Sequence, residues 1–372
     1  MPDWQLRDKT CIVGVGTTKY GAFPESDTYG LGVDALRAAA DDAGIAWSDI
    51  DGLIVCRIPS YQRFAEVARI NPQFCTSVES AGRFSGVGLG LAAQALASGA
   101  AKAVALVYGN NGRSSKAKYG GGEGTTWAPW GFTSPGAIHS MMFQRHMHEF
   151  GTTSEDLAHV AVAFRKHASL NPDAVRREPI TVEDHQKSRF VCEPLRLLDY
   201  CQINDGAVAW IMTTADRAKD MRKKPVYLSG YARQDTFTHS SVPTPDFWYP
   251  ALRKVAGEIY ARAGIGREAL DGLMIYDNFT PTVLFSLEGM GFCEQGESGA
   301  FVRDGTLELG RGRWPTNTSG GHLSESYMQG WALIAEAVRQ LRGECGPRQI
   351  PNCNALQYIC ATNIALSAIF RN

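Results

Sequence analysis

Tyr327 stands at a point in the chain where a side chain is well placed to do chemistry. It follows the polar run TNTSGGHLSES (316–326), and the apolar positions Trp331, Ile334 and Val338 continue from it at helical spacing. We therefore predict a helix that begins after 324–325, with Tyr327 in its first turn. The positive end of a helix favours a phenolate, or an anion hydrogen-bonded to a phenol. The alternative is a core tyrosine whose hydroxyl is satisfied locally.

Other polar segments match the common motifs less well. The histidines at 139, 146 and 148 lie near Glu149, but residues two apart diverge on a helix, so no metal site is predicted. The run GVGTTKYG (14–21) lacks the glycine spacing of a dinucleotide site, and KYGGGEG (118–124) lacks the Gly-Lys-Ser/Thr of a P-loop. His322 follows a Gly-Gly pair, and is either an additional hydrogen-bond donor or an inactive loop histidine.

The composition restricts the class of protein. A net charge of −1 argues against a nucleic-acid or anionic-membrane partner. No apolar run approaches the length of a membrane span, and residues 1–16 lack the anatomy of a signal peptide. The nine cysteines are scattered without a CxxC, which is typical of a reducing compartment. We expect a cytoplasmic protein.

The elements that must position these residues form an internal repeat. DDAGIAWSDIDGLIVC (41–56) matches ARAGIGREALDGLMIY (261–276) without a gap. In each copy a helix ends at a glycine suited to a left-handed cap, and a buried strand follows Asp-Gly-Leu. We predict an α/β protein of two βαβαβ halves, 1–224 and 225–372. The region of about 112–203 lies outside the repeat, and we interpret it as an inserted loop region that carries substrate or dimer contacts.

Several strings resemble the thiolase superfamily. They include IVGVGTTKYGAF (12–23), LAAQALASGAAKAVAL (91–106), NDGAVAWIMTT (204–214) and NTSGGHLSESY (317–327). The resemblance covers nearly the whole chain and implies the thiolase fold, a layered αβαβα sandwich with a loop-domain insertion. Thiolases carry a nucleophilic cysteine at the start of the helix that here ends in LAAQALASG. That position falls within GRFS (82–85), which has no cysteine, and Ser85 has no evident base.

Two further catalytic positions of thiolases correspond to tyrosines. Tyr276 opens the block YDNFT, and Tyr327 falls on the Gly-His-Pro histidine when the Gly-Gly pairs are superimposed. Cys360, in ICATN, corresponds to the remnant of a Cys-x-Gly motif. This double replacement, together with GNNGRSS and LEGMGFCEQGE, resembles the thiolase-like aldolases that shorten the side chains of steroid acyl-CoA thioesters. The resemblance implies retro-aldol cleavage of a β-hydroxyacyl-CoA, a homodimer core, and a small OB-fold and zinc-ribbon (DUF35) partner.

A retro-aldol reaction needs a base for the β-hydroxyl and donors for the enolate oxygen. One tyrosine is expected to act as acid/base and the other as donor, and the sequence leaves open which is which. We predict that Tyr276 handles the hydroxyl proton, with Asp277 close in sequence, and that Tyr327 contacts the enolate oxygen and reprotonates the α-carbon. Asp277 is alternatively a structural cap.

The remaining candidates concern binding. Arg113, Ser114 and Lys116 are candidate contacts for coenzyme A, or part of a solvated basic loop. Further candidates for substrate contact are Asn278, Gly320, Gly321 and Cys360. Coenzyme A enters only as part of the substrate, and zinc is expected in the partner alone. Two other functions stay open: a thiol-dependent acyltransferase acting on 3-oxoacyl-CoA, and a subunit that binds acyl-CoA without turnover.

Overall fold

A central sheet of nine strands organises the part of the chain that the computed structural model describes, residues 4–79, 82–117, 128–131, 134–235 and 244–372. The strand order is β3-β2-β4-β7-β1-β8-β11-β10-β9. The strands are β1 (Thr10–Thr17), β2 (Gly52–Cys56), β3 (Phe74–Val78), β4 (Ala103–Asn110), β7 (Gly206–Thr214), β8 (Val226–Asp235), β9 (Gly272–Ile275), β10 (Ala355–Cys360) and β11 (Ile364–Arg371). A separate hairpin pairs β5 (Phe190–Cys192) with β6 (Leu195–Arg196).

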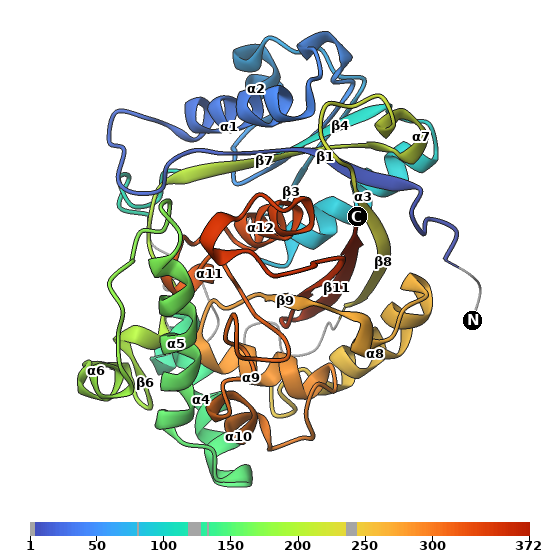
Figure 1. The fold of residues 1–372 in the computed structure, drawn as a ribbon. Helices are drawn as coiled ribbons and strands as arrows, with labels where there is room; N and C mark the ends of the chain where they lie inside the picture. Colours follow the sequence, from blue (N-terminus) through green and yellow to red (C-terminus); the bar gives the residue numbers. More distant parts are fainter. Residues whose placement is uncertain (1–3, 80–81, 118–127, 132–133, 236–243) are drawn as a thin grey trace.

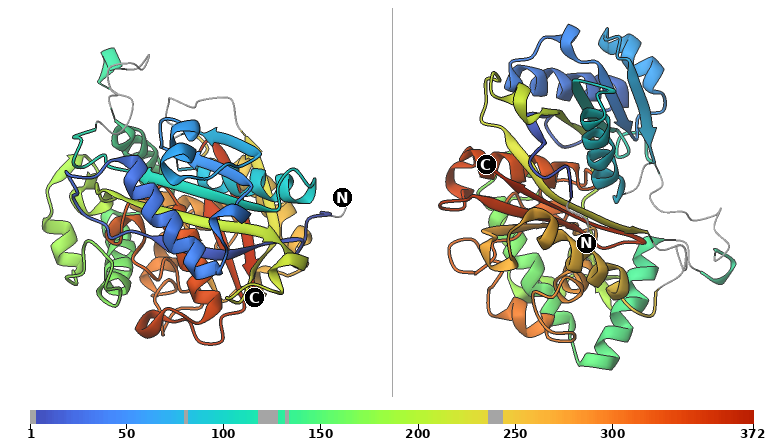
Figure 2. Two further views of the ribbon diagram at one scale, coloured as in Figure 1. Left: turned by 90° about the horizontal axis from the view of Figure 1, so that it is seen from above. Right: turned by 90° about the vertical axis from the view of Figure 1, so that its right-hand side faces the viewer.

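The sheet divides into two halves that stack as layers. Strands β1 and β8 are paired only through Cys11 with Tyr227 and Ile12 with Val226, so the two halves bend apart at this seam. Helices α3 (Phe84–Ala97) and α12 (Trp331–Arg342) fill the space between the halves (Figures 1 and 2). The outer faces carry α1 (Thr28–Ala43) and α2 (Tyr61–Ala68) on one side, and α8 (Tyr249–Ala263) and α9 (Thr280–Gly289) on the other. The predicted αβαβα sandwich of the thiolase fold is confirmed.

The predicted repeat is visible at the level of single residues. Helix α1 ends at Gly44 with φ 70° and α8 ends at Gly264 with φ 69°, both in the left-handed region that favours glycine. Asp51 accepts the backbone N–H groups of residues 102 and 103, and Asp271 accepts those of residues 354 and 355. Each aspartate therefore ties the start of its own strand to the start of the parallel neighbour. The division at 224/225 stays a prediction; these residues lie between α7 (Ala215–Ala218) and β8.

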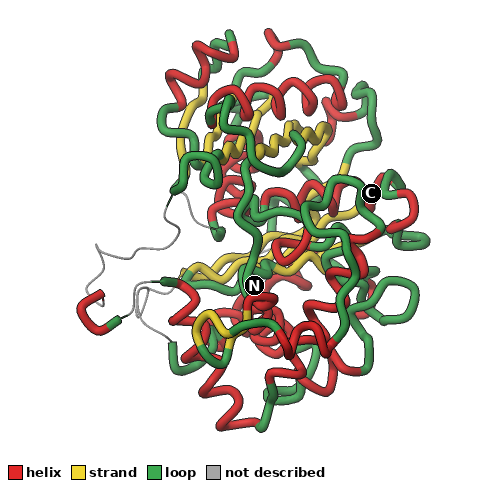
Figure 3. The backbone as a smooth tube through the Cα atoms, turned by 90° about the vertical axis from the view of Figure 1, so that its left-hand side faces the viewer, coloured by secondary structure: helices red, strands yellow, loops and turns green. Residues whose placement is uncertain are grey.

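The predicted inserted region forms helices that pack on the second half of the molecule. These are α4 (Pro135–Phe150), α5 (Ser154–Ser169) and α6 (Val182–Lys187). Helix α5 contacts α9, α10 (Ser298–Arg303) and α11 (Gly321–Ser324). Figure 1 labels these helices below the central strands, and Figure 3 shows the helices of this lower layer, in red, beneath the strands that cross the middle of the molecule. The insertion thus reaches the Gly-Gly turn that precedes Tyr327. Within the described residues, no helix is both long enough and apolar enough to span a membrane.

Candidate active site

The two predicted tyrosines meet at the junction of the halves. Tyr276 directly follows β9, and its N–H donates to the carbonyl of Ile359 at 2.8 Å, so it continues the strand ladder. Tyr327 lies between α11 and α12. The two hydroxyl oxygens are 2.8 Å apart, a hydrogen bond in which either can donate. Tyr276 is 2% exposed, whereas Tyr327 is half-buried.

The local setting of Tyr327 differs from the predicted one. Helix α12 begins at Trp331, and Gln329 (φ 48°) and Gly330 (φ 86°) interrupt any helix before it. The prediction that Tyr327 occupies the first helical turn is therefore wrong. Its N–H instead donates to Oδ1 of buried Asn204 at 2.8 Å. Sequence reasoning missed Asn204, although it directly precedes the DGAVA strand whose start faces this site.

Both phenols hold their protons firmly. Burial, followed by the charge of Tyr327, raises the pKa of Tyr276 well above its ordinary value. Burial also raises the pKa of Tyr327, and the hydrogen bonds of Tyr276 and Gln329 oppose this only in part. The expectation that a helix end would favour a phenolate at Tyr327 is therefore wrong. At neutral pH the pair presents hydroxyl donors.

Asp277 and His322 form a buried support beneath the tyrosines. The Asp277 carboxylate accepts the N–H of His322 at 2.9 Å and that of Leu323 at 3.3 Å, which caps α11. His322 Nδ1 lies 2.9 Å from Oδ1 of Asp277, at an angle too oblique for a good hydrogen bond. Its Nε2 accepts the N–H of Gly330 at 2.8 Å. The imidazole packs edge-on against both tyrosine rings, with centroids 4.8 Å and 5.3 Å away.

These contacts favour one alternative for each residue. The Asp277 carboxylate accepts two N–H groups at the helix start, which favours the cap interpretation over a base for the hydroxyl proton. The acceptor role of Nε2 means that His322 does not offer this nitrogen as a donor to a substrate. The contacts of both residues are those expected of positioning residues.

Three predicted binding residues also serve the scaffold. Gly320 (φ 104°) and Gly321 (φ 59°) are buried, and a Cβ would lie 2.5 Å from Ala168 Cβ at the first and 2.3 Å from Asp277 Oδ2 at the second. Asn278 accepts the Thr282 hydroxyl at 2.9 Å and reaches His139 Nε2 at 3.4 Å. These glycines therefore shape the turn, and Asn278 has a packing role.

The three histidines near Glu149 do not converge. His139 packs with Asn278, while His146 binds Thr152 at 2.8 Å and Glu288 at 3.2 Å, and His148 is exposed on another side of α4. Among the described residues, no group of three or more His, Cys, Asp or Glu side chains is placed to hold a metal ion.

Tyr276 packs against Gly82, in the run GRFS (82–85) where the thiolase nucleophile is expected. A Cβ built on Gly82 would lie 1.9 Å from Cζ and 2.0 Å from the hydroxyl oxygen of Tyr276. Ser85 is buried and bonded to the carbonyl of Gly82 at 3.0 Å and to the Tyr358 hydroxyl at 2.9 Å. Neither residue supplies a nucleophile beside the tyrosine pair.

The nearby thiols are poor nucleophiles as well. Cys360, at the end of β10, is buried, and burial raises its pKa to about 12. Burial likewise raises the pKa of Cys201, whose electrostatic influence reaches both tyrosines and Asp277. Sequence reasoning did not single out Cys201. Both thiols are protonated at neutral pH.

The predicted coenzyme A loop is anchored next to the site. Asp205 accepts the N–H of Arg113 at 2.8 Å and that of Ser114 at 3.1 Å, and also the Ser114 hydroxyl. The Arg113 and Lys116 side chains are exposed. Because Asn204 holds Tyr327 and Asp205 holds this loop, one dipeptide fixes the cationic loop relative to the tyrosine pair.

A second cationic side chain, which sequence reasoning missed, follows β2. Arg57 (φ 60°) donates from Nε to Asn110 Oδ1 at 2.9 Å, and Asn110 Nδ2 donates to the carbonyl of Asn204 at 2.9 Å. The Arg57 charge acts to lower the pKa of Tyr327, which places the guanidinium close enough to influence the pair.

Known proteins share this fold and sequence. A family model described as thiolase C-terminal domain-like matches residues 234–360. The 17-hydroxy-3-oxo-4-pregnene-20-carboxyl-CoA lyase of Mycobacterium tuberculosis is 37% identical over 359 residues, covering 91% of this chain and 92% of that protein. The steroid side-chain-cleaving aldolase of Thermomonospora curvata is 37% identical over 368 residues, covering 91% of each. The solved Ltp2-ChsH2(DUF35) aldolase superimposes with a TM-score of 0.91 at 35% identity, over 98% of each chain.

The fold and these identities together define the class of protein. The chain belongs to the thiolase superfamily and, within it, to the thiolase-like steroid side-chain-cleaving aldolases. It is accordingly a carbon–carbon lyase built on a thiolase fold.

Proposed function

We propose that this aldolase cleaves the Cα–Cβ bond of a steroid β-hydroxyacyl-CoA, through the hydrogen-bonded phenols of Tyr276 and Tyr327. The observation that carries the proposal is the 2.8 Å contact between their hydroxyl oxygens. Two phenols at this distance can handle both protons of a retro-aldol reaction. The names of the two relatives supply the substrate class.

The name of the mycobacterial relative describes a thioester of this kind. In a 17-hydroxy-pregnene-20-carboxyl-CoA the hydroxyl carbon C17 is β to the thioester, and C20 is the α-carbon. Cleavage of the C17–C20 bond would leave a 17-ketone and propionyl-CoA. We propose the same type of substrate here, with acetyl-CoA as the product where the side chain lacks the α-methyl group.

The protons of the reaction balance within the tyrosine pair. The β-hydroxyl proton passes to the Tyr276 oxygen as the Cα–Cβ electron pair moves to the α-carbon and the β-carbon becomes a carbonyl. The proton of Tyr276 passes to Tyr327, and the proton of Tyr327 passes to the α-carbon. Both phenols end the cycle protonated. Before that transfer, the Tyr327 hydroxyl stabilises the enolate oxygen, an effect of about 3 kcal/mol for a preorganised donor.

The raised pKa values favour this relay over a free phenolate base. A phenol that loses its proton only well above neutral pH is rarely ionised in the resting enzyme. In a relay, each phenol gains a proton on one side as it loses one on the other, so no buried negative charge accumulates. Asp277 and His322 contribute by fixing the rings, and Asn204 by fixing the backbone of Tyr327.

Substrate binding and assembly extend the proposal. Arg113, Ser114 and Lys116 are the proposed contacts for the coenzyme A phosphates, because their loop is anchored at Asp205 beside the site. The solved neighbour is named as a complex with a DUF35 component, and we propose such a partner for this chain, together with a homodimer core. No cofactor is assigned to this chain, and zinc is assigned to the partner.

Two other functions are less well supported. An acyltransferase would need a reactive thiol, whereas Cys360 is buried with a pKa of about 12 and Gly82 leaves no room for a cysteine side chain. A subunit that binds acyl-CoA without turnover would not require two phenol hydroxyls in contact.

Mass spectrometry of the reaction products tests the proposal. The chain, co-expressed with a DUF35 protein, is incubated with 17-hydroxy-3-oxo-4-pregnene-20-carboxyl-CoA. We expect equal amounts of propionyl-CoA and the 17-ketone. Intact substrate bound at one equivalent without cleavage would support the binding subunit instead, and a product that appears only with added free coenzyme A would support an acyltransferase.

A further inference from the structure

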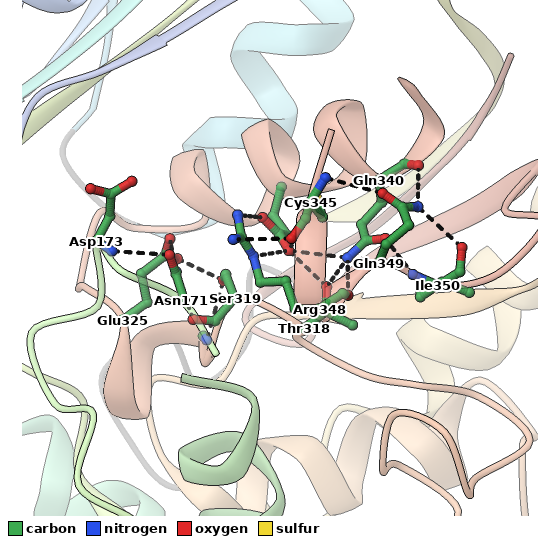
Figure 4. A network of polar contacts seen from close by, with 12 residues as sticks. Asn171, Asp173, Thr318, Ser319, Glu325, Gln340, Cys345, Arg348, Gln349 and Ile350 are labelled. Carbon is green, nitrogen blue, oxygen red and sulfur yellow. Dashed lines mark hydrogen bonds and ion pairs between the residues drawn. The ribbon is translucent and has the colours of Figure 1, made fainter. Parts of the chain in front are cut away.

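Glu325 is a buried acid two residues before Tyr327. Its side chain is 3% exposed. The carboxyl accepts the Ser319 hydroxyl at 2.7 Å and Asn171 Nδ2 at 3.2 Å, and both partners are neutral. Figure 4 shows Glu325 with Asn171 and Ser319 at one end of a polar network, apart from Arg348 and Gln340. Because burying an unpaired charge is costly, the carboxyl is favoured in its neutral form.

The side chain of Glu325 joins three segments that define the site. Ser319 belongs to the turn before α11, and Asn171 follows α5. Asn171 Nδ2 also donates to the carbonyl of Ser319 at 2.9 Å, which closes a small ring of contacts. The carbonyl of Glu325 accepts the N–H of Val175 at 3.0 Å. Glu325 thus fastens the chain just before Tyr327 to the inserted helical region.

Glu336, a second buried glutamate, differs from Glu325 in having an arginine as its partner. Glu336, on α12, forms an ion pair with Arg348 through contacts of 2.9 Å and 3.0 Å. Burial acts to raise the pKa of Glu336, but the charge of Arg348 outweighs it and the pKa falls below its ordinary value. Within the part of the chain that the structure describes, Glu325 forms no hydrogen bond or ion pair with an arginine or a lysine. Burial and then the charge of Glu336 raise its pKa to about 8, against opposing effects of Ser319, Arg339 and Arg348.

The titratable groups around Glu325 come from every side of its site. Glu336 and Arg339 face it from α12, Arg348 from the turn after α12, and Tyr20 from the loop after β1. Asp173 lies beyond Asn171 and is paired with Lys19 at 2.7 Å. Burial and the charge of Glu336 raise the pKa of Glu325, whereas the charges of Arg339 and Arg348 lower it.

We propose that Glu325 is a positioning residue that holds Tyr327 in place only while its carboxyl is protonated. The proposal rests on the function proposed above for Tyr327. The neutral carboxyl accepts the hydrogen bonds of Ser319 and Asn171 in a dry environment. Loss of the proton leaves a buried negative charge that is repelled by Glu336, and this cost releases the Tyr327 segment from its alignment with Tyr276.

The sign of the effect on stability follows from the two protonation states. In the unfolded chain a glutamate loses its proton near the ordinary pKa of 4.5, whereas the folded protein keeps it to about 8. Between these values the folded state binds a proton that the unfolded state does not, so stability falls as the pH rises through this window. Above about pH 8 the folded and the unfolded state have both lost the proton, so the contribution of Glu325 to stability no longer changes with pH.

The test compares the wild type with Glu325→Gln, which keeps the shape but carries no charge. Thermal unfolding of the chain is measured from pH 5 to pH 10. The melting temperature of Glu325→Gln, relative to the wild type, is expected to rise from pH 5 to pH 8 and then stay constant. Glu344→Gln, on an exposed residue paired with Lys223, is the control and should follow the wild type. Parallel pH dependences of Glu325→Gln and the wild type would overturn the proposal, and this result does not depend on enzyme activity.

The kinetic arm uses the same variants with the DUF35 partner and the steroid thioester. The kcat of the wild type should fall as the pH rises through about 8, approaching tenfold per pH unit, whereas Glu325→Gln should keep its rate there. Glu325→Ala, which lacks both hydrogen bonds, should lose roughly tenfold in kcat at all pH values. An alkaline loss that persists unchanged in Glu325→Gln would exclude Glu325 as its cause. Absence of turnover in the wild type would refute the proposed function instead, and the unfolding comparison would still decide whether Glu325 holds the proton.

Discussion

Gly82 lies against the phenol of Tyr276 so closely that a side chain at one position excludes the other. A Cβ on Gly82 would fall 1.9 Å from the Cζ atom of Tyr276, well inside any tolerated contact. Gly82 belongs to GRFS (82–85), the run where the thiolase nucleophile is expected. With Tyr276 in place, a cysteine could not take the place of Gly82.

Gly82→Ala should displace Tyr276 and damage the site. We expect a loss of stability of about 1–3 kcal/mol, as for overpacking in a core, and a fall in kcat of at least tenfold. Gly257→Ala is the matched control, because no described atom outside the local backbone of α8 lies within 4 Å of the place that the alanine methyl would take, and alanine there should stabilise the helix slightly. Calorimetry and product assays measure both effects. Normal stability and turnover in Gly82→Ala would contradict the steric argument.

Removal of either phenol hydroxyl should break the proton relay. Tyr276→Phe and Tyr327→Phe are each expected to lower kcat by at least about a hundredfold, the scale of a general acid or an oxyanion donor. The double variant should be little worse than either single variant, because the two hydroxyls act as a unit. Tyr61→Phe, on α2, is the control and should be unaffected. A variant with near-normal turnover would remove that tyrosine from the mechanism.

Catalysis should not depend on a thiol. The pKa of Cys360 is raised to about 12, so at pH 7.5 almost none of it is the reactive thiolate. We expect Cys360→Ala to retain turnover within about threefold, and the wild type to remain active after iodoacetamide has alkylated its accessible cysteines. Loss of activity in both experiments would revive the acyltransferase interpretation. Intact-mass measurement before and after alkylation shows which thiols have reacted.

The repeat and the pair of tyrosines could be predicted from the sequence, but their surroundings could not. The two copies match without a gap at an offset of 220 residues, so the repeat can be read from the sequence. Gly44 and Gly264 mark the end of the helix in each copy. The sequence pattern places the start of α12 too early, because Tyr327 and Trp331 are spaced as residues on one face of a helix would be. Gly330 between them was the overlooked signal, since its left-handed backbone ends any helix from Tyr327.

No local sequence pattern predicts the long-range polar contacts around the two tyrosines. Asp277 reaches the N–H groups of residues 45 and 46 positions away, and Asn204 reaches Tyr327 across 123 positions. Such contacts depend on how the two halves stack, which no local pattern encodes. The sequence therefore leaves alternative roles open for Asp277 and His322, and their contacts in the structure favour one of them.

Asp277→Asn should separate the cap role from a role as base. The carboxylate accepts two backbone N–H groups of α11, and an amide would direct its own N–H at one of them. We expect a loss of stability of about 1–3 kcal/mol and a lower kcat, through displacement of the neighbouring tyrosines. Asp184→Asn is the control: it removes a carboxylate from the exposed cap of α6 and should lower stability slightly without changing kcat. If Asp277 only positions the site, the residual activity of Asp277→Asn keeps the shape of the wild-type pH profile. An acidic limb present in the wild type and absent from the variant would instead identify Asp277 as the base.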